Sequence, residues 1–477
     1  MKPGTGYKIY LTIFLLSLTI GCTKNYKPPN LGELYTRSAQ EFHKYGNPVI
    51  VIPGILGSTL KEKDTGQIVW GAFDRDFANP ETPEGARLIA LPLDKNSSSD
   101  NVVAAGALER VKVSLLGLPL QLNAYVNILS TLGAGGFQDD SFKLEDVDYG
   151  TEHFTCFQFA YDWRLDNVEN AKRLHTFILE KKMYVEQELE KRYGIKREIK
   201  FDIVAHSMGG LIARYYMMYG DTDLDEIVDT EGPSWKGAEL VENVIIIGTP
   251  NAGSVNVVDD LFHGKDIGPF LPTYQSSIIG SMPSTYQLLT RTRHKHVVDQ
   301  NGVVLDLFDP KVWEKYNFGL MNPDQEYMLE ILLPDVKDKD ERKEIAYDYL
   351  TYSLDRAKRF QNALDKQSEP PDTVKFYLMA GDSVATPATY KVNTDTGKIV
   401  EITTSHGDGT VTRASAVMDE RAGNVEWTPY IQSPIKWTNV MFLFSDHLGI
   451  TKDPTFSDNI LFILLENPAN YKLPKES

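Results

Sequence analysis

The stretch that decides the fold is Phe201-Asp-Ile-Val-Ala205-His206-Ser207-Met208-Gly209-Gly210. A short apolar run, typical of a buried β-strand, leads into a serine, and a helix can begin directly after it. The positions two before and two after the serine hold Ala205 and Gly209, which are small enough for a very tight turn. The pattern predicts a nucleophile elbow, which holds a reactive serine at the end of a strand. A small-residue turn around an ordinary serine fits this stretch equally well, so other residues must decide between the two interpretations.

Partners for such a serine can be sought by chain order, because an acid and then a histidine follow the serine of an elbow. One of the nine histidines, His447, follows an apolar run at 440–444 and is the candidate base. Asp408 lies between two glycines, which allow a sharp turn that leaves its carboxylate free to accept from an imidazole. An ordinary turn aspartate also fits Asp408. Asp446 is a weaker candidate for the acid, because neighbouring side chains seldom point at each other.

The charge that develops during attack on a carbonyl needs two backbone N–H donors. The residue after the serine, Met208, supplies one of them in an elbow. The run Pro48-Val-Ile-Val-Ile52-Pro-Gly-Ile55-Leu-Gly-Ser58 is a buried-type strand that breaks into a glycine-rich loop, and Ile55 is the candidate for the second donor. Without the elbow, a plain strand-to-turn junction would be the preferred interpretation of this run.

Further blocks of sequence occur in a fixed order between residues 49 and 449. They are Val51-Ile-Pro-Gly-Ile-Leu-Gly-Ser-Thr-Leu60, Tyr161-Asp-Trp-Arg164, Ala205-His-Ser-Met-Gly209, Ile247-Gly-Thr-Pro-Asn-Ala-Gly-Ser254, Gly407-Asp-Gly-Thr-Val411 and His447-Leu-Gly449. Together they resemble the lecithin:cholesterol acyltransferase-like family, which includes the lysosomal phospholipase A and the phospholipid:diacylglycerol acyltransferases.

The resemblance implies an α/β-hydrolase fold, with a mostly parallel sheet, helices on both faces and an inserted lid. It implies the same site residues that the chemistry selects: a triad of Ser207, Asp408 and His447, with Ile55 and Met208 as the oxyanion hole. By resemblance Trp70 would line an acyl pocket, although a packed core tryptophan fits this position as well. Mammalian members pin the lid with a disulfide, and this chain has no cysteine pair for one.

The expected function is that of a membrane-tethered serine esterase that acts on phospholipids or acylglycerols through an acyl-enzyme on Ser207. An O-acyltransferase that passes the acyl group to a lipid alcohol is the near alternative, because the family contains both outcomes. A catalytically inactive, lipid-binding surface lipoprotein is the alternative of another class. We expect no cofactor and no metal, and the sequence leaves the oligomeric state open.

The composition suits one large catalytic domain, with 477 residues of which 42% are hydrophobic. The net charge of −17 argues against a nucleic-acid partner. The basic stretch Arg291–His296 is expected to be a solvated loop and not a metal or phosphate site, because no acidic or cysteine ligand accompanies it. The block Tyr161–Arg164 fits both a role at the rim of the active site and a buried ion-paired corner of Asp162 and Arg164, and we expect the corner.

The N-terminus predicts a membrane tether. Lys2 and Lys8 precede a 12-residue apolar stretch, Ile9–Ile20, and Cys22 follows it. Because about 20 apolar residues are needed to span a bilayer, this stretch predicts a signal peptide, here of the bacterial lipoprotein type with Cys22 lipidated. A conventionally cleaved or an uncleaved signal is the alternative. The expected location is the bacterial cell envelope, at the outer membrane or the cell surface. Lipidation leaves Cys156 alone, as a small buried residue on a strand.

Alternating elements indicate an α/β protein. Strands are expected near 49–52, 154–160, 200–204, 243–247, 374–379 and 438–444, and helices near 168–193, 209–219 and 341–366. The expected organisation is a signal peptide at 1–21, a spacer at 22–45, a core in two parts at 46–254 and 373–477, and a lid at 255–372. The first part of this lid, Val255–Leu289, contains apolar pairs that look exposed, such as Leu261-Phe262, Phe270-Leu271 and Ile278-Ile279. An ordinary irregular insertion is the alternative to a lid.

Overall fold

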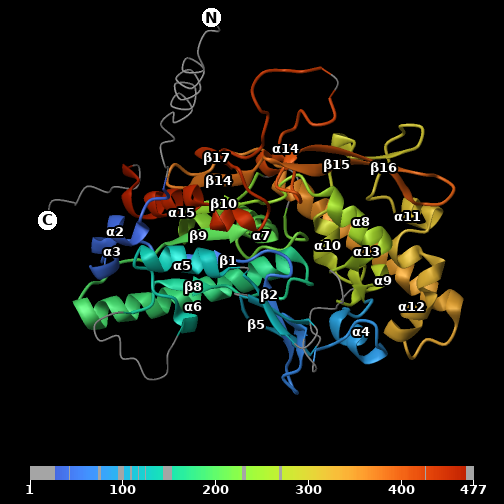
Figure 1. The fold of residues 1–477 in the computed structure, drawn as a ribbon, viewed down its shortest axis with the longest axis horizontal. Coiled ribbons are helices and arrows are strands. Elements are labelled where there is room, and N and C mark those ends of the chain that lie inside the picture. Colours follow the sequence, from blue (N-terminus) through green and yellow to red (C-terminus); the bar gives the residue numbers. More distant parts are fainter. Residues whose placement is uncertain are drawn as a thin grey trace, which may run out of the picture.

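The fold is described from a computed structural model of the chain (Figure 1). The described residues are 27–41, 43–73, 77–94, 101–107, 110–115, 118–123, 125–142, 153–227, 232–267, 271–424 and 426–468. The predicted signal peptide and Cys22 therefore lie outside the described residues, as does Phe270. Within the described part of the chain, no helix has both the length and the apolar character to cross a membrane.

The centre of the molecule is a parallel sheet, for which the described residues provide six strands. Their order across the sheet is β17 (Asn439–Leu443), β14 (Lys375–Gly381), β10 (Val241–Ile247), β9 (Phe201–His206), β1 (Val49–Ile52) and β8 (Cys156–Gln158). All six predicted strands are present. Because the strands are parallel, the loops after β1, β9 and β17 meet at one edge, where the functional residues of such sheets gather.

Alternate residues of the central strands face two different helical layers, as expected for a sheet buried on both faces. One layer contains α6 (Asn167–Tyr193), α7 (Met208–Tyr219) and α13 (Lys339–Leu364), and it packs on residues such as Ile203 and Ile246. The other contains α5 (Val126–Ala134) and α15 (Pro454–Leu461), and it packs on residues such as Val204 and Ile245. The fold is therefore the expected α/β-hydrolase type, with helices on both faces.

Helix α6 illustrates how local sequence sets the boundaries of an element. The Asp166 side chain accepts a hydrogen bond from the Val168 amide at 2.8 Å and so caps the first turn. The helix ends at Gly194, whose φ of 67° lies in the left-handed region that glycine adopts without strain. The expected helix near 168–193 is confirmed, and it leads directly toward β9.

The segment between β10 and β14 contributes helices and no strand of the central sheet in the described residues. Its helices lie together on the right of the sheet in Figure 1. They are α8 (Val255–His263), α9 (Ser276–Ile279), α10 (Pro283–Gln287), α11 (Pro310–Tyr316), α12 (Glu326–Leu332) and α13. The expectation of exposed apolar side chains in its first part is wrong for Leu261, Phe262 and Ile278, which are at most 1% exposed. Phe262 stacks on Phe318, and both belong to the same hydrophobic core as Ile203 and Ile246 of the central sheet.

A long hairpin after β14 was absent from the sequence prediction. Its strands are β15 (Val384–Val392) and β16 (Ile399–Gly407), and β15 also pairs in parallel with β13 (Val297–Asp299). In Figure 1 the hairpin runs from the central sheet across the helices of the inserted segment. The hairpin therefore joins the inserted segment to the second part of the core and ends directly at Asp408.

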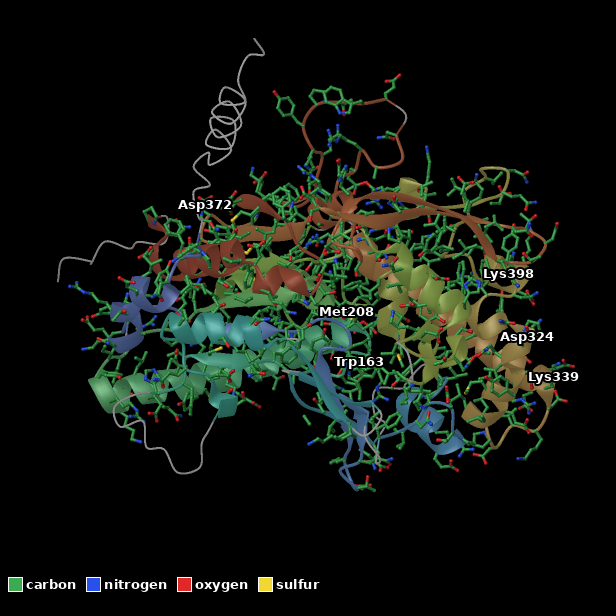
Figure 2. The ribbon with its side chains drawn as sticks, viewed as in Figure 1. Trp163, Met208, Asp324, Lys339, Asp372 and Lys398 are labelled. Carbon is green, nitrogen blue, oxygen red and sulfur yellow. The ribbon has the colours of Figure 1, made fainter. Side chains whose placement is uncertain are left out.

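Smaller elements surround this body. Two further sheets are β3-β2-β5 and β4-β6-β7, and β11 pairs with β12. The bounds are β2 (Ser58–Glu62), β3 (Ile68–Trp70), β4 (Ala72–Phe73), β5 (Val102–Ala107), β6 (Arg110–Leu115), β7 (Leu118–Asn123), β11 (Lys265–Asp266) and β12 (Thr273–Tyr274). The remaining α-helices of the described residues are α2 (Leu31–Leu34), α3 (Thr36–Gln40), α4 (Pro83–Ile89) and α14 (Arg413–Val417). Figure 2 shows charged residues such as Asp324 and Lys339 at the periphery, with Met208 and Trp163 inside.

Two expectations about polar residues had opposite outcomes. Arg164 is fully buried and makes a double hydrogen bond with Asp162, so the buried ion-paired corner is confirmed. The expectation that Arg291–His296 is a solvated loop is wrong, since Arg291 and His294 are buried. Asp365 binds Arg291, and Glu420 binds His294. These acidic partners come from distant parts of the chain, which is why the local sequence did not reveal them.

Candidate active site

Ser207 lies in a sharp turn between β9 and α7. Its φ of 52° and ψ of −128° form a combination that non-glycine residues rarely adopt. The turn is held in place because the Ser207 amide donates to the Ile247 carbonyl at 2.8 Å, and the Thr249 hydroxyl donates to the Ser207 carbonyl at 2.8 Å. The elbow geometry expected from the sequence is therefore present.

The two positions after Met208 must be glycines, because a side chain at either would clash with a neighbouring loop. A Cβ atom at Gly209 would lie 2.4 Å from the Pro53 carbonyl oxygen, and one at Gly210 would lie 2.0 Å from the Thr249 hydroxyl. Both distances are far below van der Waals contact. The turn thus brings α7 against the loops after β1 and β10, and only residues without a side chain fit there.

Three side chains from distant segments meet at this turn. His447 Nε2 lies 3.0 Å from Ser207 Oγ, and His447 Nδ1 lies 2.7 Å from Asp408 Oδ2. Since a carboxylate only accepts, Nδ1 carries the proton, and the lone pair on Nε2 can take the serine proton. The Asp408 side chain is 1% exposed and that of His447 is 16% exposed. The structure thus brings the predicted triad together, and the catalytic roles of its members stay predictions.

The two aspartates considered for the acid have different surroundings. Asp408 Oδ1 accepts from the amides of Thr410 and Val411 at 2.9 and 2.7 Å, which leaves Oδ2 directed at His447. The His447 amide also donates to the Asp408 carbonyl at 2.9 Å. Asp446 is exposed, and its Oδ1 accepts from the Gly449 amide at 2.6 Å. The geometry therefore favours Asp408 as the partner of the imidazole.

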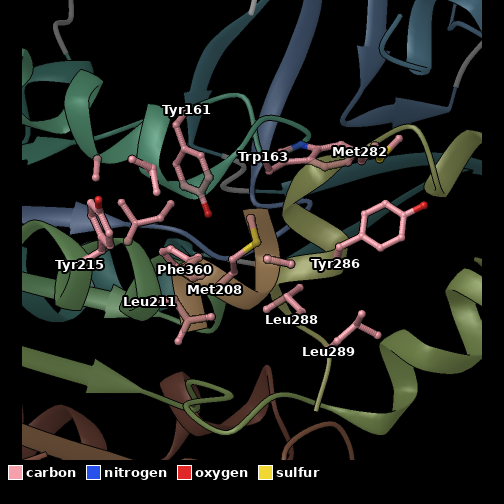
Figure 3. Close-up of a cluster of buried hydrophobic side chains, with 14 of the residues drawn as sticks. Tyr161, Trp163, Met208, Leu211, Tyr215, Met282, Tyr286, Leu288, Leu289 and Phe360 are labelled. Atoms are coloured by element: carbon pink, nitrogen blue, oxygen red, sulfur yellow. The ribbon is translucent and has the colours of Figure 1, made fainter. Parts of the chain in front are cut away.

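The residues of the two predicted oxyanion donors lie next to Ser207, one in sequence and one in a neighbouring loop. Met208 is the first residue of α7, so its amide has no carbonyl one turn earlier in the helix to bond with. The loop with Ile55 passes directly beside the serine, because a Cβ atom at Gly54 would lie 2.7 Å from Ser207 Cβ. The side chain of Met208 points into the apolar core near Tyr161 and Leu211, so its amide is held by a packed helix (Figure 3).

Trp70 is a core residue that supports the oxyanion loop. It is 5% exposed, and its ring packs edge-on against Trp163 with the ring centres 5.6 Å apart. Its indole N–H donates to the Leu56 carbonyl at 2.8 Å, and Leu56 has a positive φ of 61°. The core interpretation of Trp70 is therefore confirmed, while a role as an acyl-pocket wall stays a prediction.

The block 247–254 contacts the loop that carries Asp408. A Cβ atom at Gly248 would lie 3.3 Å from both Asp408 Oδ2 and His447 Nδ1, so this glycine keeps the space around that pair small. The Ser415 hydroxyl donates to the Gly253 carbonyl at 2.6 Å, and the side-chain amide of Asn251 donates to the Ala416 carbonyl at 2.7 Å. These bonds connect the loop after β10 to helix α14, which follows Asp408.

Sequence reasoning missed two residues that contact this site. His206 and Tyr125 are both buried, and Tyr125 Oη lies 3.1 Å from His206 Nδ1. The position of His206 next to Ser207 was the only signal for it. No motif marks Tyr125. Among the described residues, no group of three or more histidine, cysteine, aspartate or glutamate side chains is arranged to hold a metal ion.

Comparison with known proteins agrees with this fold. The model of the lecithin:cholesterol acyltransferase family matches residues 143–428. The chain belongs to this family. Membership places it among the lipid-ester hydrolases and acyltransferases. A separate comparison with curated proteins found no match.

Several solved structures are similar over most of the chain. The Tle4–Tli4 complex matches with a TM-score of 0.50 and 16% identity over 87% of this chain and 97% of that chain. Lipase BlEst2 of Bacillus licheniformis in its mature form matches with a TM-score of 0.28 and 13% identity, over 88% and 91% of the two chains. Lipase 1 of Pelosinus fermentans matches with a TM-score of 0.35 and 12% identity, over 90% and 100%. At 16% identity the first comparison supports the fold alone.

Proposed function

We propose that this family member is a serine esterase that cleaves acyl esters of phospholipids or acylglycerols. The observation that carries the proposal is the hydrogen-bonded series from Ser207 Oγ to His447 to Asp408 at the strained elbow. A serine proton that can pass to a histidine 3.0 Å away gives an activated nucleophile.

In the proposed reaction, Ser207 Oγ attacks the ester carbonyl carbon while its proton passes to His447 Nε2. The amides of Ile55 and Met208 hold the resulting oxyanion. Collapse of this intermediate breaks the bond to the alcohol, which leaves with the proton from His447. Water, activated by His447, then attacks the acyl-enzyme and releases the fatty acid. Asp408 holds the imidazole in the tautomer that both steps need.

A serine-directed fluorophosphonate probe tests the nucleophile. We expect the wild type to be labelled and Ser207→Ala not to be labelled, with hydrolysis of p-nitrophenyl butyrate reduced at least about 10⁴-fold in Ser207→Ala and in His447→Ala. Both variants should unfold at the wild-type temperature. A well-folded wild type that is neither labelled nor active would contradict the enzyme and favour the lipid-binding alternative.

Acyl transfer to a lipid alcohol is the second candidate function, and the name of the matching family favours it. Both outcomes share the acyl-enzyme and differ only in the acceptor. Incubation of the protein with phosphatidylcholine and a long-chain alcohol, followed by lipid analysis, separates them. Free fatty acid as the only product supports hydrolysis, and a new ester that disappears in Ser207→Ala supports transfer.

Exposed apolar side chains beside His447 support a lipid surface as the place of action. Phe444 is 88% exposed and Leu448 is 48% exposed, and they lie three residues before and one residue after His447. In the loop between α14 and β17, which projects from the body in Figure 1, Trp427 is 82% exposed and Tyr430 88% exposed. Exposed apolar side chains that gather beside a functional site are typical of contact with another molecule, whereas single ones are common on any surface. Aromatic rings suit the boundary of a membrane.

Serine substitutions test this contact. Phe444→Ser and Trp427→Ser should lower hydrolysis of phosphatidylcholine vesicles and leave hydrolysis of soluble p-nitrophenyl butyrate unchanged. Met183→Ser is the matched control, because Met183 is a 56% exposed apolar residue on α6. Equal loss on both substrates would indicate damage to the site and not to lipid contact. The proposed lipid anchor at Cys22 and the proposed location in the cell envelope would bring this surface to its substrate.

A further inference from the structure

A buried series of hydrogen bonds connects the oxyanion loop to the histidine loop. The Gly54 amide donates to Tyr125 Oη at 2.8 Å, and Tyr125 Oη lies 3.1 Å from His206 Nδ1. His206 Nε2 lies 3.0 Å from the His447 carbonyl oxygen. The series therefore passes through two side chains and ends at the backbone of the two loops that carry Ile55 and His447.

The proton of each bond can be assigned from the chemistry of the partners. The His447 carbonyl only accepts, so His206 Nε2 carries a hydrogen and His206 Nδ1 has a free lone pair. Tyr125 must then donate to Nδ1, while its oxygen accepts from the Gly54 amide. All three bonds are satisfied at once by one tautomer of His206.

Burial keeps this arrangement neutral. Tyr125 is 4% exposed and His206 is 2% exposed. Burial, followed by the nearby charge of His447, lowers the pKa of His206 to about 3. His206 therefore stays uncharged at neutral pH, where a second positive charge beside His447 would oppose the proton transfer from Ser207.

We propose that Tyr125 and His206 are positioning residues, which fix the Ile55 amide and the His447 ring relative to Ser207. The proposal rests on the acyl-enzyme function proposed above. Its physical basis is that His206 belongs to the rigid strand β9 and directly precedes Ser207. Gly54 directly precedes Ile55, and the carbonyl held by His206 belongs to the residue whose ring must lie between Ser207 and Asp408.

The two ends of the series reach the chemistry in different ways. Fixing the Gly54 amide restrains the turn that carries the next amide, that of Ile55, which is the predicted oxyanion donor. This turn is also closed by a bond from the Gly57 amide to the Gly54 carbonyl at 3.0 Å. Fixing the His447 carbonyl restrains the backbone from which the imidazole reaches Ser207. Both effects act on the geometry of the transition state and only weakly on the binding of the ester.

Three variants test the proposal with p-nitrophenyl butyrate as the probe. Tyr125→Phe and His206→Leu remove the bonds and keep the volume, and His206→Gln retains one acceptor and one donor. We expect kcat to fall about 10- to 100-fold in the first two, with KM within about twofold of wild type, and a substantial part of the loss to be recovered in His206→Gln. The rate of fluorophosphonate labelling should fall in parallel with kcat.

A matched control separates positioning from stability. The hydroxyl of Tyr219 donates to the Ala363 carbonyl at 2.9 Å in a buried place on α7, at the end of the helix away from Ser207. Tyr219→Phe should lower the melting temperature about as much as Tyr125→Phe and leave kcat unchanged. In the double variant Tyr125→Phe/His206→Leu, the fold decrease in kcat should be no more than about twice that of the more affected single variant. Either change alone already breaks the same series of hydrogen bonds.

Failure of the positioning role can be told apart from failure of the proposed esterase function. If the wild type is unlabelled and inactive, the proposed function fails and the positioning role fails with it. If the wild type is active and folded Tyr125→Phe keeps its kcat, only the positioning proposal is overturned. Should His206→Leu fail to fold, Tyr125→Phe and His206→Gln decide the question.

Discussion

Asp408 Oδ2 lies 2.7 Å from His447 Nδ1, while the neighbour of His447 in sequence, Asp446, directs a carboxylate oxygen at the Gly449 amide 2.6 Å away. Asp408, which is 39 positions from His447 in sequence, thus contacts the imidazole, whereas the adjacent Asp446 closes a turn. This difference in contacts leads directly to a test of which carboxylate is the acid.

Asp408→Asn should lower kcat at least about 10³-fold, because an amide cannot hold the same histidine tautomer as a carboxylate. Asp446→Asn should lower kcat less than about threefold, because its side-chain oxygen can still accept from the Gly449 amide. Steady-state kinetics on a soluble ester at constant pH measures both values. The opposite ranking would transfer the role of the acid to Asp446.

Gly54→Ala should nearly abolish activity without an effect of backbone strain, since Gly54 does not have a positive φ. The added methyl would lie 2.7 Å from Ser207 Cβ and 3.3 Å from Ser207 Oγ, so either the serine or the oxyanion loop must move. A displacement of about 1 Å at a reacting centre can cost about 10²-fold in rate. We expect a loss of that size in kcat on p-nitrophenyl butyrate.

Gly133→Ala in α5 is the control for this substitution, because no atom outside the adjacent residues and the backbone of the helix itself lies within 4 Å of the position of its added methyl. It should keep full activity and a melting temperature at or above that of wild type, since alanine favours a helix. Wild-type kcat in Gly54→Ala would show that the oxyanion loop does not lie against Ser207.

Asp202→Asn should stabilise the protein above pH 6. Asp202 is buried at the start of β9, and burial raises the pKa of its carboxyl group from 3.8 to about 6. A raised pKa in the folded state means that the contribution of this group to stability is fully present below pH 4 and is lost as the pH rises to about 6. A shift of about two pKa units corresponds to an unfolding free energy on the order of 3 kcal/mol at most.

The neutral amide avoids this loss, and the Asn243 side-chain oxygen, which is buried without a hydrogen-bond partner, can accept from it. Melting temperatures of wild type and Asp202→Asn should therefore agree near pH 4 and separate between pH 4 and 6, with the variant higher. Asp335→Asn, at an exposed aspartate, serves as the control and should show a difference that does not change with pH. A wild type that is the more stable protein at pH 7 would refute the expectation.

Cys22→Ser should release the protein from the membrane if Cys22 is lipidated. Acyl chains contribute about 0.8 kcal/mol per buried CH₂, and anchoring by two signals is stable. Wild type should partition into the detergent phase and resist extraction by high salt, whereas the variant should be soluble or unprocessed. The variant should keep activity on a short-chain soluble ester and lose it on membrane lipid at low concentration. Identical partitioning of the two proteins would leave a plain signal sequence in place of the anchor.

Local sequence determined the parts of this protein that depend on periodicity and on single turns. The strands of the central sheet, helix α6 with its end at Gly194, and the elbow at Ser207 all follow from apolar runs and small residues. The candidates Asp408 and His447 followed from chain order on an elbow, and in the structure His447 contacts Ser207 and Asp408 contacts His447. Such features need no knowledge of which segments meet.

Only the tertiary structure decided the contacts between distant segments. The hydrogen bond of Tyr125 to His206 joins residues 81 positions apart, and that of His206 to His447 joins residues 241 positions apart. The burial of Arg291 against Asp365 and the pairing of β13 with β15 have the same origin. A residue's own neighbourhood in sequence fixes its backbone preference, but its partners depend on how complete elements pack, since burial and hydrogen-bond satisfaction are properties of the whole fold.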